Sequence, residues 1–148
     1  MNLRRRLLWA LGLGWGCGAT PALFAQHVPQ EQLLQPYVGV NAVQKGRVKL
    51  EIARLADNGF NVPLKVSVAS PMTAQDHVRR LLLLANRNPR PLMAAFEFGP
   101  SSDQVLIATR VRLGGSQTVY ALAQTSDGLW WLDTAEVEVT ESACLDQT

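Results

Sequence analysis

Apolar and polar residues alternate through most of the chain, in short runs that are separated by turn-forming residues. In the clearest example, Val62, Leu64, Val66 and Val68 alternate with residues that are polar, small or turn-forming. Successive side chains of a strand point to opposite faces, so a period of two is typical of a strand with one buried face. The pattern predicts half-buried strands and argues against amphipathic helices over the same residues.

Eight such runs lie between residues 47 and 140. They cover residues 47–52, 62–69, 78–85, 93–98, 105–113, 117–124, 129–132 and 135–140. The segments between them are rich in turn formers, as in Asp57-Asn58-Gly59, Asn88-Pro89-Arg90-Pro91, Gly114-Gly115-Ser116 and Ser126-Asp127-Gly128. Many short strands without intervening helices favour an all-β, antiparallel β-sandwich over an α/β fold.

Two of the runs are apolar on both faces, namely Leu81–Leu84 and Leu129–Leu132. A sandwich sheet that faces water should have one polar face, so something must cover the outer side of these strands. Residues 26–46, in which Pro29 and Pro36 leave room for at most one short helix, are one candidate cover. The other is a second protein, bound through an interface of Trp and Leu side chains.

The first 25 residues have the pattern of an export signal. Arg4-Arg5-Arg6 precede an apolar stretch that runs from Leu7 to about Gly18, and small Ala25 suits the cleavage position. The stretch is too short for a membrane anchor, and the arginine pair resembles a twin-arginine signal, although three arginines also suit the general secretory route. We therefore expect a periplasmic protein that is cleaved after Ala25.

Cleavage would leave 123 residues, which is enough for one domain. We expect an N-terminal segment at 26–46, the sandwich at 47–140 and a flexible C-terminal arm at 141–148. Three of the 14 basic residues and none of the 12 acidic ones lie in the signal, so the mature chain has 11 basic and 12 acidic residues, a net charge of −1. This balance argues against nucleic acid or an anionic membrane as a partner.

Cys144 is the one cysteine outside the predicted signal, since Cys17 lies within it. It has no partner for an internal disulfide, so it is reactive, paired with another molecule, or without function. His27 and His77 are the only histidines and are 50 residues apart, so neither a metal site nor a catalytic triad has an evident set of residues. We expect His77 to be a turn or surface residue, and Asp76 and Asp127 to lie in turns, where Asp forms local backbone hydrogen bonds. We expect no catalytic residue, metal or cofactor.

Several motifs, in the same order and with the same spacing, resemble the SoxY family of thiosulfate-oxidation carrier proteins over about residues 40–144. They are Asp57-Asn58-Gly59 with Val62-Pro63-Leu64, Ser70-Pro71-Met72-Thr73 with Asp76-His77-Val78, Asn88-Pro89-Arg90-Pro91, Thr109-Arg110-Val111-Arg112-Leu113 and Ser126-Asp127-Gly128. The resemblance implies an immunoglobulin-like sandwich that pairs with a second such subunit, SoxZ. It also implies that Cys144 carries sulfur covalently, first as an S-thiosulfonate and then as a persulfide.

In that family a haem-containing enzyme couples thiosulfate to the cysteine and a hydrolase releases sulfate, so the carrier itself is not an enzyme. The tail of this chain departs from the family ending, Gly-Gly-Cys-Gly-Gly, because Ser142-Ala143 and Leu145-Asp146 stand in place of the four glycines. Glycine permits a slim and mobile arm. The departure leaves one alternative open, in which the chain is an immunoglobulin-like binding or accessory module of a periplasmic dehydrogenase.

Overall fold

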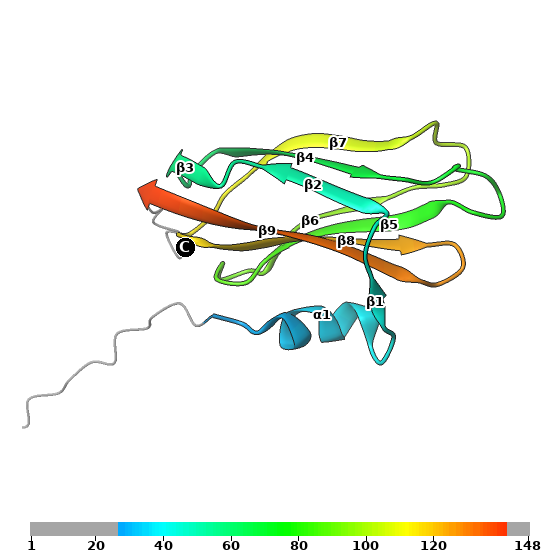
Figure 1. The fold of residues 1–148 in the computed structure, drawn as a ribbon, viewed down its shortest axis with the longest axis horizontal. Helices are drawn as coiled ribbons and strands as arrows, with labels where there is room; N and C mark the ends of the chain where they lie inside the picture. Colours follow the sequence, from blue (N-terminus) through cyan, green and yellow to red (C-terminus); the bar gives the residue numbers. More distant parts are fainter. Residues whose placement is uncertain (1–26, 142–148) are drawn as a thin grey trace, which may run out of the picture.

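The computed structural model describes residues 27–141, which form one helix followed by nine strands (Figure 1). The helix is α1 (Gln30–Val38), and the strands are β1 (Val43–Gln44), β2 (Val48–Ile52), β3 (Leu55–Asn58), β4 (Val62–Val68), β5 (Val78–Ala85), β6 (Leu92–Glu97), β7 (Val105–Val111), β8 (Gln117–Thr125) and β9 (Trp130–Glu141). Two sheets stack face to face, as the alternating pattern predicts.

The larger sheet has the strand order β1-β9-β8-β5-β6, with β3 also paired to β9, and the smaller sheet has the order β2-β4-β7. All pairings among β5, β6, β8 and β9, and among β2, β4 and β7, are antiparallel. The predicted antiparallel sandwich is therefore confirmed. The two short strands β1 and β3 are an addition, and both run parallel to β9.

The prediction of two separate strands at 129–132 and 135–140 was wrong, because β9 is continuous from Trp130 to Glu141. The expected break between the two strands falls at polar Asp133 and Thr134. In the structure its carboxylate Oδ2 accepts a hydrogen bond of 2.8 Å from the backbone amide of Leu50, so the strand continues through a polar residue whose charge is satisfied. A second difference is β3, which the turn motif at residues 57–59 concealed.

The main core lies between the two sheets and follows the predicted alternation. On β4, Val62, Leu64, Val66 and Val68 are all buried, while the residues between them are exposed or half-buried. Burial of one such side chain contributes roughly 1.5–3 kcal/mol. The inter-sheet core thus accounts for the strands that have a single apolar face.

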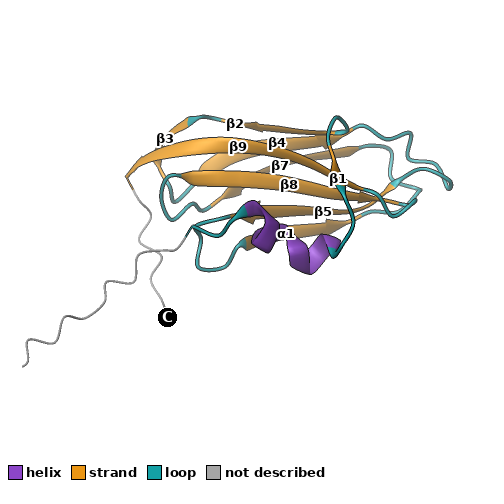
Figure 2. Ribbon diagram, turned by 60° about the horizontal axis from the view of Figure 1, so that its bottom comes forward, coloured by secondary structure: helices purple, strands orange, loops and turns teal. Residues whose placement is uncertain are grey.

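Helix α1 lies against the outer face of the larger sheet (Figure 2), and a second core lies between them. Its sheet residues are Leu82, Leu84, Tyr120, Leu122, Trp130 and Leu132, and its helix residues are Leu33, Leu34 and Val38. The N-terminal segment therefore covers the strands that are apolar on both faces. The alternative, that Leu81–Leu84 and Leu129–Leu132 form a protein interface, was wrong for these buried residues. Leu129 alone remains 39% exposed.

Pro29 and Gly39 set the limits of α1, and Pro36 lies within it. Pro29 precedes the first turn, where its missing N–H is not needed, and its carbonyl accepts a hydrogen bond of 2.9 Å from Leu33 N. Gly39 adopts φ 60°, in the left-handed region that favours glycine, and ends the helix. Within residues 27–141 no helix has the length and apolar character needed to cross a membrane.

Candidate functional site

Cys144, the predicted site of covalent attachment, lies outside the described residues, as do the expected signal and the arm after Glu141. Cys144 is the third residue after Glu141, at which β9 ends. An extended chain of this length spans at most about 11 Å. The described surface that bears on the chemistry of this thiol is therefore the end of the sandwich at which β9 terminates.

Side-chain hydrogen bonds hold the end of β9 in place. Ser116 Oγ accepts a hydrogen bond of 2.8 Å from Val139 N, and Thr140 Oγ1 donates one of 2.8 Å to the carbonyl of Asp57. On the same side of β9, Asn58 of β3 is in register with Glu141. The sequence identified Ser116 and Asp57 only as turn residues, and the pairing of their turns with β9 depends on the tertiary structure.

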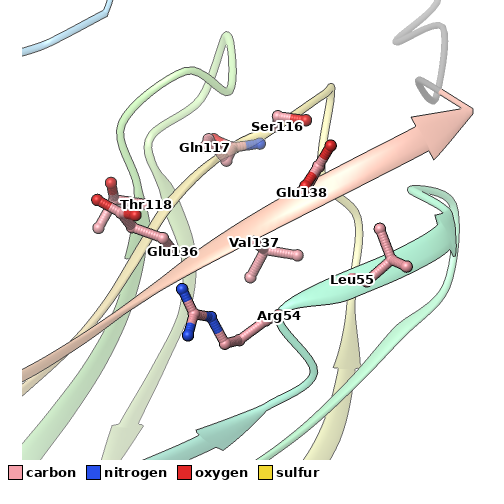
Figure 3. A pocket seen from close by; sticks show the side chains of 8 residues that line it. All are labelled: Arg54, Leu55, Ser116, Gln117, Thr118, Glu136, Val137 and Glu138. Atoms are coloured by element: carbon pink, nitrogen blue, oxygen red, sulfur yellow. The ribbon is translucent and has the colours of Figure 1, made fainter.

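A shallow pocket of about 540 Å³ lies beside this strand end (Figure 3). It is lined by Arg54, Leu55, Ser116, Gln117, Thr118, Glu136, Val137 and Glu138. Glu136 and Glu138 are exposed, and Arg54 is the cation among the lining residues. The lining holds no cysteine or histidine, and residues 27–141 contain no group of three or more His, Cys, Asp or Glu side chains arranged to hold a metal.

His77 and Asp127 lie in turns at the opposite end of the sandwich, as predicted. His77 Nδ1 lies 2.9 Å from the carbonyl of Thr73. Asp127 Oδ1 accepts hydrogen bonds of 2.6 Å from Thr125 Oγ1 and 3.1 Å from Leu129 N, and these hold the pKa of Asp127 below its ordinary value. These contacts stabilise turns.

The side chain of Asp76 does not form the local backbone hydrogen bond that its turn position predicts. Its carboxylate forms a bidentate ion pair with Arg47 at 3.0 and 3.1 Å, and the Arg47 guanidinium also stacks over the ring of Trp131. Arg47 therefore connects the start of β2 to the loop before β5 and to β9. Arg47, Asp76 and Trp131 thus hold these three segments together, and the charges of Arg47 and Asp76 compensate each other.

His27 lies at the same end of the sandwich as the end of β9, where it contacts buried Asn86. Asn86 Oδ1 accepts a hydrogen bond of 3.1 Å from Thr118 N, so the other polar atom of this side chain is the amide nitrogen Nδ2. Nδ2 lies 3.0 Å from His27 Nε2 and donates to it. His27 Nε2 thus acts as an acceptor. The adjacent Val28 N donates to the Asn86 carbonyl at 3.0 Å, so this contact anchors the N-terminal segment. The two histidines lie at opposite ends of the domain.

These features define a class: an immunoglobulin-like β-sandwich whose one cysteine beyond the predicted signal follows a firmly held last strand. Comparison with known families is more specific. The family model of the sulfur oxidation protein SoxY matches residues 35–144, and the last matched residue is Cys144. The chain belongs to this family, and membership supports a sulfur-carrier role in sulfur oxidation. No curated protein sequence matches the chain.

Solved structures share the fold. The sulfur carrier protein SoxY from Chlorobium limicola f thiosulfatophilum superposes with a TM-score of 0.60 and 20% identity, over 72% of this chain and 87% of that one. A superoxide reductase (neelaredoxin) from Ignicoccus hospitalis gives 0.57 and 20%, over 64% and 80%. A superoxide reductase from Nanoarchaeum equitans gives 0.54 and 12%, over 65% and 100%. At such identities the likeness concerns the fold alone.

Proposed function

We propose that this chain is a periplasmic sulfur carrier of a thiosulfate-oxidising system, with Cys144 as the covalent attachment site. The observation that carries the proposal is the family match, which extends through residue 144 to the one cysteine beyond the predicted signal. The position of this cysteine supports it further, because it follows directly on a strand end that Ser116 and Asp57 hold in place.

The carrier chemistry balances in two steps. In the first, the thiol and thiosulfate form a new S–S bond, Cys–SH + S₂O₃²⁻ → Cys–S–S–SO₃⁻ + H⁺ + 2e⁻, and a haem-containing enzyme takes the two electrons. In the second, a hydrolase adds water, Cys–S–S–SO₃⁻ + H₂O → Cys–S–SH + SO₄²⁻ + H⁺. The persulfide sulfur is then oxidised or transferred, which frees the thiol for another cycle.

The chain supplies the nucleophilic sulfur and its position, and partner enzymes supply the catalysis. Glu141 and Asp146 are close to Cys144 in the sequence, and negative charges oppose formation of a thiolate. The pocket beside β9 has no histidine or cysteine that could act as a base or resolve the sulfur adduct. Activation of the thiol therefore falls to the enzyme that accepts the tail.

A second β-sandwich subunit of the SoxZ type is the expected stable partner, and the free edge of β6 supports a place for it. Among the described strands β6 pairs only with β5, and its residues from Leu92 to Phe96 carry no charge, while its last residue is Glu97. Leu92 on β6 is 40% exposed. An uncharged edge strand is a template for pairing with a strand of another chain.

Export through the twin-arginine route completes the proposal. Replacement of Arg4-Arg5 by Lys-Lys should stop export, while the mature N-terminus of the unchanged protein should be Gln26. Normal export of the Lys-Lys form would assign the signal to the general secretory route and would leave the carrier chemistry intact.

One observation favours a second candidate function. Ala143 and Leu145 flank the thiol where the family has glycines, so enzymes with narrow entrances would accept this tail poorly. An accessory module of a periplasmic dehydrogenase, without a carrier role, would tolerate such a change.

Mass spectrometry of the intact protein distinguishes these functions. The protein purified from its host during growth on thiosulfate should carry sulfur adducts that reducing agents remove, and Cys144→Ser protein purified in the same way should carry none. Adducts that persist in the Cys144→Ser variant, or their absence from the wild-type protein, would contradict the carrier function.

A further inference from the structure

Four exposed arginines gather at the end of the sandwich where β9 terminates. Arg87 and Arg90 belong to the loop between β5 and β6, Arg110 is on β7, and Arg112 follows that strand. The antiparallel register puts the end of β5, the end of β7 and the end of β9 at the same end of the molecule. We call these four residues the arginine cluster.

Hydrogen bonds join the two loops that carry the cluster. Asn88 Nδ2 donates to the carbonyl of Arg112 at 2.9 Å, and Asn88 Oδ1 accepts from Gly114 N at 2.9 Å. Arg87 Nη1 donates to the carbonyl of Ser116 at 2.9 Å. The cluster therefore sits on loops with defined positions, and its presentation to a partner requires little ordering on binding.

An aromatic side chain extends the surface. The Arg112 guanidinium lies over the ring of Phe60, 5.0 Å from the ring centroid, and Phe60 is 46% exposed. Leu113 N donates to the carbonyl of Gly59 at 2.8 Å, which holds the two segments together. Arginine and aromatic side chains are enriched among the residues that dominate binding energy in protein interfaces.

The cluster is connected directly to the strand that leads to Cys144. The Ser116 carbonyl accepts a hydrogen bond from Arg87, and Ser116 Oγ accepts one from Val139 N. Ser116 alone therefore links the Arg87 guanidinium to the backbone near the end of β9. On the other side, Asn58 is in register with Glu141 and its Oδ1 accepts from Phe60 N at 2.6 Å. A protein that receives the tail must approach this surface.

Among the side chains that the structure describes, those of residues 27–140, no carboxylate forms an ion pair with the cluster. The ion pairs among residues 27–140 involve Arg47, Lys49, Lys65 and Arg80, and none includes a cluster arginine. The residues with a carboxylate at this end include Asp57 on β3, Glu141 at the end of β9, and Glu136 and Glu138, which line the pocket with Arg54 (Figure 3). The exposed guanidinium groups of the cluster are thus available to the carboxylates of a partner.

We propose that the arginine cluster, with Phe60, is the docking surface for the enzyme that joins thiosulfate to Cys144, and that this enzyme presents a carboxylate-rich rim around its entrance. The inference rests on the proposed function and adds a recognition surface to it. Guanidinium groups bind carboxylates in bidentate geometry, and opposite charges at a docking site accelerate association by about 10- to 1,000-fold at low salt. The cluster would orient the domain so that the tail meets the entrance.

The association rate with that enzyme, purified from the same host, tests the inference. All proteins carry Cys144→Ser, so that binding is measured apart from loading. The test variant is Arg90→Glu/Arg110→Glu, because these side chains make no hydrogen bond to the rest of residues 27–141. The matched control, Lys45→Glu/Arg79→Glu, makes the same charge change on exposed residues at the other end of the sandwich.

The cluster variant should associate at least about tenfold more slowly at low ionic strength, with a flattened salt dependence, while the control should stay within about threefold of the parent. Equal rates for the two variants, or no association of the parent protein, would overturn the inference. Charge-dependent association together with a wild-type protein that never acquires sulfur would uphold the docking surface and remove the carrier function.

Discussion

Asp133 of β9 accepts a 2.8 Å hydrogen bond through Oδ2 from the backbone amide of Leu50 on β2. A side chain of one sheet thus provides the acceptor for a backbone N–H on an edge strand of the other. Its second carboxylate oxygen, Oδ1, accepts from Thr134 N at 2.9 Å. Because β2 and β9 lie in different sheets, this contact closes one side of the sandwich. It also keeps β9 continuous toward the candidate site.

Asp133→Ala should therefore destabilise the domain. The amide of Leu50 would lose a charged acceptor in a half-buried position, and a loss of this kind amounts to about 1–3 kcal/mol in the free energy of unfolding. Urea denaturation of the mature protein measures the difference. Asp103→Ala, at an exposed loop aspartate, is the control and should change stability by no more than about 0.5 kcal/mol. Equal stabilities of the two variants would show that the hydrogen bond contributes nothing.

Leu34→Ala should weaken the docking of α1. Leu34 is 3% exposed and belongs to the core beneath the helix, where truncation of a leucine reduces stability by about 2–5 kcal/mol. Loosening of the helix should also expose Leu82 and Leu122 and increase the binding of an apolar dye. Val40→Ala, at a fully exposed residue just beyond the helix, should have neither effect. A Leu34→Ala protein as stable as the control would contradict the covering role of α1.

Leu92→Lys should reduce affinity for the second β-sandwich subunit by at least about tenfold, because a charge on an edge strand opposes pairing with another strand. Leu129→Lys is a matched control, since Leu129 is 39% exposed and Leu92 is 40% exposed, and Leu129 lies in the turn before β9. Titration of the two purified subunits, followed by light scattering, gives both affinities. The same affinity for the two variants would place the partner elsewhere than on the β6 edge.

Replacement of residues 142–148 by Gly-Gly-Cys-Gly-Gly, with the thiol kept at position 144, should speed loading by enzymes from a system whose carrier has glycines. Leu145 adds a bulky side chain beside the thiol, and Ala143 restricts the backbone more than glycine does. Mass spectrometry over time measures the rate of adduct formation, with a Gly-Gly-Ser-Gly-Gly tail as the control. Equal rates for the native and the glycine tails would mean that side-chain bulk does not select the enzymes.

Local patterns sufficed for the sheets. Val62, Leu64, Val66 and Val68 specify a strand with one buried face because the pleat of a strand puts every second side chain on the same side. Family motifs such as Asn88-Pro89-Arg90-Pro91 and the position of Cys144 likewise depend only on the order of residues along the chain. These features determined the fold class, the family and the candidate attachment site.

Contacts between distant segments decided the remainder. The sequence shows that Leu82 and Leu132 need cover, but whether α1 or another protein supplies it depends on the free energy of a helix packing on a sheet some 50 to 100 residues further along the chain. Arg87 and Arg112 belong to different loops, and hydrogen bonds of Asn88, Ser116 and Gln117 join these loops at the end of the sandwich where β9 terminates. Apolar burial does not depend on the order of residues along the chain. The tertiary structure alone therefore determined which surfaces are buried and which charges lie at the end of the sandwich where β9 terminates.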